Sequence, residues 1–392
     1  MSASKPRRRS PSSSFWALLV VVGLVTFGYL FSQGVFNPLL RRVGLDPAWF
    51  GLEHAAQPAA SIATDAGSLE VFFTTPELVY PDVPRNRLAP AHERALLADL
   101  RSATRSIDVA SFEYNLTSLA DALVAARQRG VKVRLALDRA NLENPVMAKW
   151  AGIVEDAGIP ISWEESSNFL HSKFVVIDER IVWTGSWNPT INDTYRNNNN
   201  ILRSTIPVLV ANYRAEFERM ADGDFGKRKS GATPYPTIQM GDVLIENYFS
   251  PTEPVRDRIV AYLAEAERSI DVMAFSFTAD EIGEAMVERH QAGVPVRVVF
   301  ENRNAAGTGS EFDRLSDSGI DVLKDGNCYT MHHKVIIIDR RIVITGSYNF
   351  TARAEDANDE NLLIINDAAL AAGYQEEFAR VYAQARNPLR CN

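Results

Sequence analysis

The sequence predicts an α/β protein made of two similar halves behind an N-terminal membrane helix. Three observations predict this: a strand–helix–strand pattern that occurs twice, a duplicated polar motif, and an uncharged apolar segment near the N-terminus. Strands that alternate with amphipathic helices are typical of α/β folds with a parallel or mixed sheet. At 392 residues, the chain is long enough to bury two cores.

The segment 15–31, FWALLVVVGLVTFGYLF, contains no charged residue. As a helix it would span roughly 25 Å, near the lower limit for crossing a bilayer. Because basic residues precede it, the positive-inside bias predicts a single-pass anchor, with a basic tail (1–14) in the cytoplasm and the body outside the cytoplasm. A cleaved signal peptide is the alternative. The Pro-, Ala- and Ser-rich segment 32–66 is predicted to be a juxtamembrane linker.

The net charge of −8 is unevenly distributed. Residues 1–45 carry six basic and no acidic residues, so the remainder holds 35 basic against 49 acidic residues. An acidic body argues against tight non-specific binding of nucleic acid, which depends on basic surface. It does not exclude a basic cleft.

The internal repeat extends over most of the chain. The segment 103–115, ATRSIDVASFEYN, matches 266–278, AERSIDVMAFSFT, and each is followed by an amphipathic helix and another strand. We expect two repeats, 67–224 and 241–388, joined by a linker at 225–240. The first repeat carries 13 extra residues within the Pro-rich segment 75–90, which is either a substrate-contacting lid or a plain surface insertion.

A polar motif occurs once in each repeat, as HSKFVVIDERIVWTGSWN (171–188) and HHKVIIIDRRIVITGSYN (332–349). Both copies read His-x-Lys, four residues, Asp, six residues, Gly-Ser-x-Asn, at a constant offset of 161. Residues i and i+2 of a strand share a face, so the His and Lys of each copy point the same way. The Asp ends the apolar run, where side chains accept backbone hydrogen bonds in turns.

Two such copies, face to face, would place two imidazoles and two ammonium groups around one anion. A neutral His can attack phosphorus and form a covalent phospho-histidine. The other His can protonate the leaving oxygen and then deprotonate water. Lysine, serine and asparagine groups can hold the charge that develops on the non-bridging oxygens, so no metal is needed. The remaining histidines, at 54, 92 and 290, form no metal-ligand spacing.

The doubled motif resembles the signature of the phospholipase D superfamily, over most of the chain after about residue 67. The resemblance implies two α/β/α sandwich halves packed about a pseudo-twofold axis, with one active site between them. It implies no cofactor and no obligate protein partner, and a monomer because both motifs lie in one chain. The catalytic set that it implies is His171, Lys173, Asp178, His332, Lys334 and Asp339.

Individual roles also follow from the resemblance. It makes His171 the nucleophile and His332 the general acid, while Asp178 and Asp339 support the fold of the hairpin more than the chemistry. The side chains that match its phosphate-binding positions, besides the two lysines, are Ser186, Asn188, Ser347 and Asn349.

After the motifs the two halves differ, with NDEN (358–361) opposite NNNN (197–200). Members of the superfamily often carry an acidic residue here that orients an active-site His, so Glu360 is the candidate and Asn199 its uncharged counterpart. A carboxylate beside an imidazole raises the pKa of that imidazole. We therefore expect the histidine linked to Glu360 to serve as the acid. A plain polar turn is the alternative.

Cys328 and Cys391 are the only cysteines. A body outside the cytoplasm would allow them to form a disulfide that ties the C-terminus beside the second motif. Two cysteines without a spacing pattern leave this open.

The predicted activity is phospholipase D-type hydrolysis of phospholipids to phosphatidate and a head-group alcohol. The compact halves and the GSYNFT sequence also resemble the small nuclease and cardiolipin-hydrolase branch, so endonuclease cleavage of DNA or RNA is an alternative. Phosphatidyl transfer of the cardiolipin-synthase type would use the same residues with an alcohol in place of water. A non-catalytic, membrane-tethered binding module is a further alternative, which the intact His and Lys of both motifs argue against.

Overall fold

The computed structural model describes residues 27–28, 31, 36, 39–40, 43–45, 59–64 and 67–389. The chain divides into two compact units, Met1–Ala55 with Val79–Leu88, and Ala56–Leu78 with Ala89–Asn392. In the smaller unit, the ring of Phe27 contacts those of Phe31 and Phe36, and Arg87 pairs with Asp82 at 2.6 Å. The larger unit contains both copies of the motif.

The first half of the larger unit is built on an eight-stranded mixed sheet in the order β1-β2-β8-β7-β6-β3-β4-β5. Its strands are β1 (Ala60–Thr64), β2 (Gly67–Phe73), β3 (Ser106–Ser111), β4 (Lys132–Asp138), β5 (Ile161–Glu164), β6 (Phe174–Ile177), β7 (Ile181–Gly185) and β8 (Asn200–Ser204). β3, β4 and β5 pair in parallel, and all other neighbours pair antiparallel.

The second half repeats this architecture in the order β13-β12-β11-β14-β15-β16-β10-β9. Its strands are β9 (Thr237–Met240), β10 (Val243–Ser250), β11 (Ile270–Ala274), β12 (Val296–Phe300), β13 (Asp321–Lys324), β14 (Lys334–Ile338), β15 (Ile342–Gly346) and β16 (Glu360–Asn366). Again only β11, β12 and β13 pair in parallel. The predicted α/β fold of two similar halves is confirmed.

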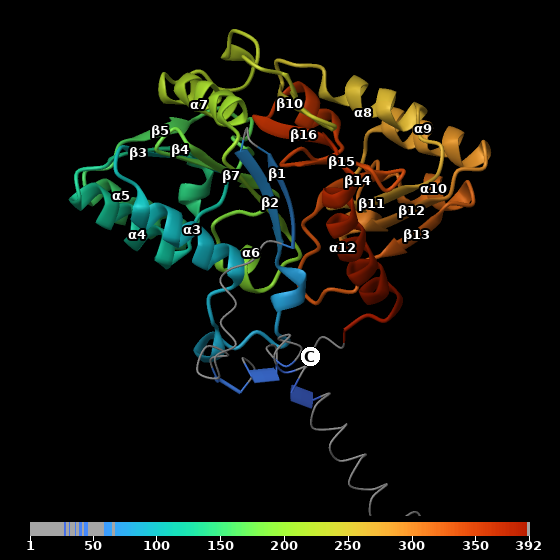
Figure 1. Ribbon diagram of the computed structural model, residues 1–392, viewed down its shortest axis with the longest axis horizontal. Coiled ribbons are helices and arrows are strands. Elements are labelled where there is room, and N and C mark those ends of the chain that lie inside the picture. Colours follow the sequence, from blue (N-terminus) through green and yellow to red (C-terminus); the bar gives the residue numbers. More distant parts are fainter. Residues whose placement is uncertain are drawn as a thin grey trace, which may run out of the picture. The chain divides into compact units, whose positions relative to one another are not determined.

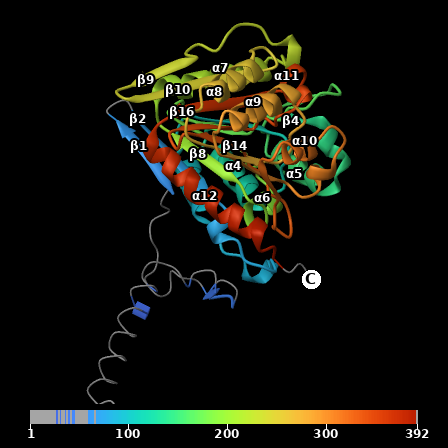
Figure 2. The same ribbon diagram turned by 90° about the vertical axis from the view of Figure 1, so that its right-hand side faces the viewer.

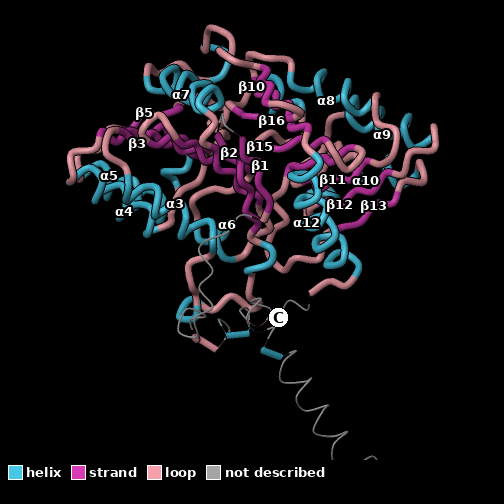
Figure 3. Tube along the Cα trace, in the orientation of Figure 1, coloured by secondary structure: helices cyan, strands magenta, loops and turns pink. Residues whose placement is uncertain are grey.

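Helices cover both faces of each sheet (Figures 1 and 3). The helices of the first half are α3 (Ala91–Ser102), α4 (Thr117–Gln128), α5 (Pro145–Asp156), α6 (Ile191–Tyr195) and α7 (Pro207–Ala221). Those of the second half are α8 (Val255–Ala264), α9 (Asp280–Gln291), α10 (Phe312–Asp317), α11 (Ala352–Asp356) and α12 (Ala368–Arg386). Because the central strands are buried on both faces, their sequences read as nearly continuous apolar runs.

Three hydrophobic clusters fill the layers between these elements. One lies outside the first sheet under α3, α4 and α5, and another lies outside the second sheet under α8, α9 and α10. The third joins the inner faces of both sheets with α7 and α12, and includes Phe174, Phe217, Val335 and Phe378. The two halves therefore share one continuous core.

α12 also reaches the first sheet, where it packs beside β1 and β2 (Figure 2). A Cβ atom added to Gly373 of α12 would lie 2.6 Å from the Cβ atom of Ala60 in β1. Any larger side chain at this position would separate the helix from the strand. β1 itself belongs to the segment that was predicted as a juxtamembrane linker, and the last part of the predicted 225–240 linker forms β9.

The predicted location, a single-pass membrane protein with its body outside the cytoplasm, is wrong. The part of the chain that the structure describes contains no helix long and apolar enough to cross a membrane. Most of the predicted anchor, 15–31, lies outside the described residues, as does the basic tail 1–14. We therefore withdraw the prediction of a single-pass protein with its body outside the cytoplasm.

Cys328 is disulfide-bonded. The one other cysteine of the chain, Cys391, lies outside the described residues.

Candidate active site

Both histidines of the motif lie where the two halves join. Leu170 forms a parallel bridge with Asp359, and the backbone N–H of His171 donates to the carbonyl of Asp359 at 2.9 Å. The second half repeats these contacts at the equivalent positions, with a bridge from Met331 to Asn198 and an N–H···O bond from His332 to Asn198 at 2.9 Å. Such reciprocal contacts are those of an isologous, two-fold arrangement.

The first histidine is held by a carboxylate from the opposite half. Nδ1 of His171 lies 2.7 Å from Oε2 of Glu360, the first residue of β16, and both side chains are buried. The hydroxyl of Ser347 donates to the same oxygen at 2.7 Å. An ionised carboxylate only accepts hydrogen bonds, so Nδ1 of His171 carries the proton and Nε2 keeps its lone pair.

The second histidine is held by an amide and, slightly farther away, a carboxylate. Nδ1 of His332 lies 3.1 Å from Oδ1 of Asn199 and 3.4 Å from Oδ2 of Asp193. The amide of Asn199 is oriented by its Nδ2, which donates to the backbone carbonyl of Asp193, and by the hydroxyl of Ser186, which donates to Oδ1. Nδ1 of His332 is therefore also the protonated nitrogen.

Each lysine of the motif lies beside its histidine. Nζ of Lys173 donates to the carbonyl of His171 at 2.6 Å, and Nζ of Lys334 donates to that of His332 at 2.7 Å. An aromatic ring from the neighbouring strand end flanks each pair: Phe112 contacts His171, and its counterpart Phe275 contacts His332. Each ammonium also lies over the same ring, at 5.6 Å for Lys173 and 4.4 Å for Lys334.

Burial favours the uncharged forms of both histidines. It lowers the pKa of His171 to about 4 against the opposing effect of Glu360, and it lowers the pKa of His332 to about 4 against that of Asp193. Burial also acts to raise the pKa of Glu360, but His171, Lys173 and Ser347 together hold it below its ordinary value. A neutral imidazole beside an ionised carboxylate is a competent nucleophile.

The two lysines interact electrostatically with each other across the site. Burial lowers the pKa of Lys173 to about 8, and it lowers that of Lys334 well below its ordinary range with a further contribution from the charge of Lys173. Like charges enclosed together favour loss of a proton, and a bound anion relieves this repulsion. The site is therefore organised to receive negative charge.

The motif aspartates lie at the other end of their hairpins. Asp178 accepts hydrogen bonds from the backbone N–H groups of 104, 105 and 106, and Asp339 accepts the equivalent bonds from 267, 268 and 269. Both have a positive φ in the left-handed region, as tight two-residue hairpin turns require. Their contacts hold the hairpin against the strand before it and do not reach the histidines.

The glycine that closes each returning strand allows a close approach of backbones. A Cβ atom on Gly185 would lie 2.3 Å from the carbonyl oxygen of Asn200, and one on Gly346 would lie 2.2 Å from that of Asn361. The serine that follows each glycine is thereby placed beside the partner of a histidine, which is Asn199 just before β8 or Glu360 at the start of β16.

Three of the four predicted phosphate-binding side chains form hydrogen bonds with other side chains of the site. Both serine hydroxyls bond to the partners of the histidines, as described above. Asn188 donates its backbone N–H and its Nδ2 to Asp193 at 2.7 and 2.8 Å. Asn349 differs, because its Oδ1 is buried without a hydrogen-bond partner. Direct contact of these four residues with phosphate stays a prediction.

Polar contacts beneath the histidines also cross between the halves. Asn200 donates to Thr345 at 2.8 Å, and its counterpart Asn361 donates to Thr184 at 3.0 Å. His333 is buried between Asn200 at 3.1 Å and Glu377 at 3.0 Å.

In the first half, the counterpart of Glu377 is Glu216, which pairs with the buried Lys229 at 2.5 Å. Lys229 also pairs with Asp359 at 2.8 Å. The backbone beside His171 is thus anchored by a buried group of charges, whereas the matching glutamate of the second half meets the imidazole of His333.

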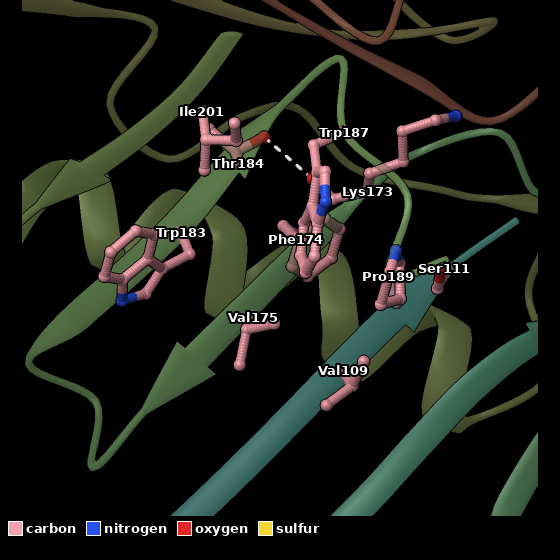
Figure 4. Close-up of a pocket in the computed structure, with 11 residues that line it drawn as sticks. Val109, Ser111, Lys173, Phe174, Val175, Trp183, Thr184, Trp187, Pro189 and Ile201 are labelled. Carbon is pink, nitrogen blue, oxygen red and sulfur yellow. Dashed lines mark hydrogen bonds between the residues drawn. The ribbon is translucent and has the colours of Figure 1, made fainter. Parts of the chain in front are cut away.

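A small apolar pocket of about 20 Å³ lies under the first motif (Figure 4). Val109, Val175, Trp183 and Trp187 line it, and the side chain of Lys173 leads away from them. These apolar side chains lie next to Lys173, and burial lowers the pKa of that lysine.

Sequence reasoning missed Asp193, Glu113 and the two phenylalanines. Phe112 and Phe275 occupy matching places in the repeat, and this match could have identified them. Asp193 and Glu113 have no acidic counterpart, because the second half carries Ala354 and Ser276 there. Burial raises the pKa of Glu113, with a further contribution from Asp193, while Lys173 and Lys334 lower it, so Glu113 belongs to the same electrostatic environment.

Both repeats match a known protein family. The family model described as "Cardiolipin synthase, PLD-like domain" matches residues 96–221 and 259–382. The mitochondrial cardiolipin hydrolase of Chlamydomonas reinhardtii is 37% identical over 134 residues, which are 34% of this chain and 60% of that protein. A phospholipase D of Rickettsia prowazekii is 36% identical over 147 residues, 37% of this chain and 72% of that protein.

A solved structure shows the same fold. Phosphatidylserine synthase from Haemophilus influenzae Rd KW20 superimposes with a TM-score of 0.58 at 14% identity, over 74% of this chain and 83% of that one. The cardiolipin hydrolase is named as mitochondrial, which also differs from the location predicted from the sequence. Because the family model matches both repeats and more than half of the chain, the chain belongs to the phospholipase D superfamily, with its PLD-like domain present twice.

Proposed function

We propose that this protein is a phosphodiesterase of the phospholipase D type that hydrolyses phospholipids through a phospho-histidine intermediate. The observation that carries the proposal is the reciprocal support of the histidines, each of which is hydrogen-bonded at Nδ1 by the opposite half. This support leaves Nε2 of both rings for chemistry. Two lysines next to them supply positive charge for the phosphate.

His171 is the proposed nucleophile. Bond formation between Nε2 and phosphorus leaves the ring positively charged, and the carboxylate of Glu360 in direct contact with Nδ1 stabilises that charge. The histidine linked to Glu360 was also expected to serve as the acid, and that histidine is His171. These two assignments exclude each other, and we retain the nucleophile role for His171.

His332 is the proposed general acid. Its nearest Nδ1 acceptor is the uncharged amide of Asn199, so its cationic form holds the Nε2 proton less firmly than that of His171 would. In the first step, Nε2 of His171 bonds to phosphorus, and the bond from phosphorus to the leaving oxygen breaks as that oxygen takes the proton from Nε2 of His332.

The second step returns the site to its starting state. Nε2 of His332 removes a proton from water, and the water oxygen bonds to phosphorus while the bond to His171 breaks. The products are an alcohol and a phosphomonoester, which is phosphatidate for a phospholipid. Lys173 and Lys334 stabilise the non-bridging oxygens in both steps.

The choice of phospholipid rests on two observations. The relatives that match at 36% and 37% identity are named phospholipase D and cardiolipin hydrolase, and the chain carries a net charge of −8, which disfavours a polyanion as the main substrate. The same groups would cleave a nucleic-acid phosphodiester, or transfer the phosphatidyl group to an alcohol in place of water. Both are outcomes of the experiment that follows.

The test uses the full chain in EDTA, with vesicles of phosphatidylcholine, phosphatidylethanolamine or cardiolipin and, in parallel, single-stranded DNA. We expect head-group release that is lost in His171→Asn and kept in the control variant His290→Asn, which changes a half-buried histidine at the end of α9. Phosphatidate formed without added alcohol indicates hydrolysis, whereas turnover that appears only when an alcohol such as ethanol is added indicates transfer. Cleavage of DNA without lipid turnover would overturn the lipid assignment, and no turnover of either substrate would overturn the phosphodiesterase assignment.

A further inference from the structure

The two histidines receive carboxylates from different places in the repeat. Glu360 of the second half stands at the position that the uncharged Asn199 occupies in the first half. The carboxylate beside His332 instead comes from Asp193, at a position where the second half has the buried Ala354. One half thus combines glutamate with alanine, and the other combines asparagine with aspartate.

The surroundings of Asp193 fix its carboxylate with several donors. Oδ2 accepts from the backbone N–H of Asn188 at 2.7 Å and from its Nδ2 at 2.8 Å, and Oδ1 accepts from Asn197 at 2.6 Å. The hydroxyl of Thr190 caps the short helix α6 by accepting from the backbone N–H of Asp193. The side chain is 4% exposed, so its negative charge acts through a medium of low polarity.

That charge faces the cationic form of His332. We propose that Asp193 is the relocated charge partner of His332, a positioning residue that replaces the glutamate absent at Asn199 and enables His332 to act as the general acid. The inference deepens the proposed function and rests on it for the role of His332. At 3.4 Å, the carboxylate supports the imidazolium without a direct contact like that of Glu360 with His171.

Other charged groups act on this pair. Lys334 on β14 and Lys173, which immediately precedes β6, disfavour a positive charge on His332. Burial acts to raise the pKa of Asp193, but His332 and the donated hydrogen bonds hold it well below its ordinary range. Glu113 and the buried His92 on α3 also interact with the carboxylate. Removal of Asp193 would leave His332 with two cations and one neutral amide, so the pKa of His332 would fall.

The repeat supplies a direct test by exchange. The double variant Asp193→Ala with Asn199→Glu gives the first half the alanine and glutamate that the second half has at Ala354 and Glu360. We expect Asp193→Ala and Asp193→Asn to lower kcat/KM about 10²-fold, with the basic limb of the pH profile moved to lower pH. The double variant should regain at least about a tenth of the original kcat/KM. If Asp193 only held the loop in place through Asn188 and Asn197, a glutamate at position 199 would not restore kcat/KM.

A second readout needs no substrate. The pKa of His332 is measured by NMR of isotopically labelled histidine in the full chain, with Asp121→Asn on the exposed face of α4 as the matched control for a lost carboxylate. We expect a lower pKa of His332 in Asp193→Asn, recovery in the double variant, and little change in the control. An unchanged pKa of His332 in folded Asp193→Asn would overturn the inference. Because this readout is independent of turnover, it separates failure of the inference from failure of the proposed function.

Discussion

The two halves of this protein share the same backbone arrangement but carry different side chains at the site. In both, a hairpin carries His and Lys at its entrance and closes with a glycine that approaches the next strand. The halves differ in the group that contacts the histidine of the opposite half. Glu360 lies 2.7 Å from His171, whereas His332 lies 3.1 Å from the amide of Asn199 and 3.4 Å from the carboxylate of Asp193.

In the proposed mechanism, this difference gives unequal roles to two histidines that the fold makes equivalent. A carboxylate in direct contact stabilises a ring that becomes a lasting cation, as a phospho-histidine does. A weaker, shared contact suits a ring that must give up and regain a proton. The fold therefore supplies the symmetry and single substitutions supply the division of roles.

The largest effect should come from the histidines themselves. We expect His171→Asn and His332→Asn each to reduce kcat by about 10⁴- to 10⁶-fold, with the double variant no slower than the worse single variant, because residues that act as one unit are not additive. Steady-state assay of lipid hydrolysis checks this. If the loss of kcat in the double variant equalled the product of the two single losses, the two histidines would act independently. The two halves would then not share one site.

The next effect distinguishes the two histidine partners. We expect Glu360→Gln to lower kcat/KM about 10²-fold and Asn199→Ala to cost less, about 10-fold. Glu360 favours the imidazolium of His171, so its loss lowers the pKa of His171 further. The nucleophile is the neutral form, so the acidic limb of the kcat/KM profile should move to lower pH. A limb that stays in place would contradict the assigned contact.

The buried charges beneath the histidines should differ in stability between the halves. Lys229→Met removes the buried ammonium that lies between Glu216 and Asp359, although Arg219 still pairs with Glu216 at 2.7 Å. The loss should lower the free energy of unfolding by about 3–5 kcal/mol. His333→Gln, which affects one carboxylate in the second half, should cost only about 1–2 kcal/mol. Urea denaturation with the exposed Lys149→Met as control measures both. Equal losses would show that the asymmetry of charge has no energetic consequence.

The smallest effect tests where the halves are alike. Asp178→Asn and Asp339→Asn should each lower the free energy of unfolding by about 1–3 kcal/mol, because each aspartate accepts several backbone hydrogen bonds. The two losses should agree closely, and kcat should change little. A large fall in kcat for either variant, without loss of stability, would show that the aspartate takes part in catalysis.

The sequence predicted the duplicated motif and the two α/β halves, but not the matching pair Phe112 and Phe275. Constant spacing revealed the two motifs, and apolar alternation with amphipathic helices revealed two α/β halves, because these patterns are local and occur twice. Glu360 was also named as a candidate, through its place after the second motif, and it lies 2.7 Å from His171.

Features that depend on the packing of distant segments escaped sequence reasoning. Asp193 reaches His332 only because the halves pack face to face, and no local pattern separates a buried carboxylate from one in a polar turn. Lys229 was placed in a linker, although its ammonium is buried between two carboxylates of different segments. The edge strands β1 and β9 were missed for a similar reason, since short edge strands depend on the neighbour with which they pair.

The central claim is that the two halves are unequal, with His171 as the residue that bonds to phosphorus. The most direct measurement is to trap the covalent intermediate by rapid quench with labelled substrate and to locate the phosphoryl group by mass spectrometry. We predict an acid-labile phosphoramidate on His171, absent in His171→Asn. A phosphoryl group found on His332 in the unaltered protein would contradict the account.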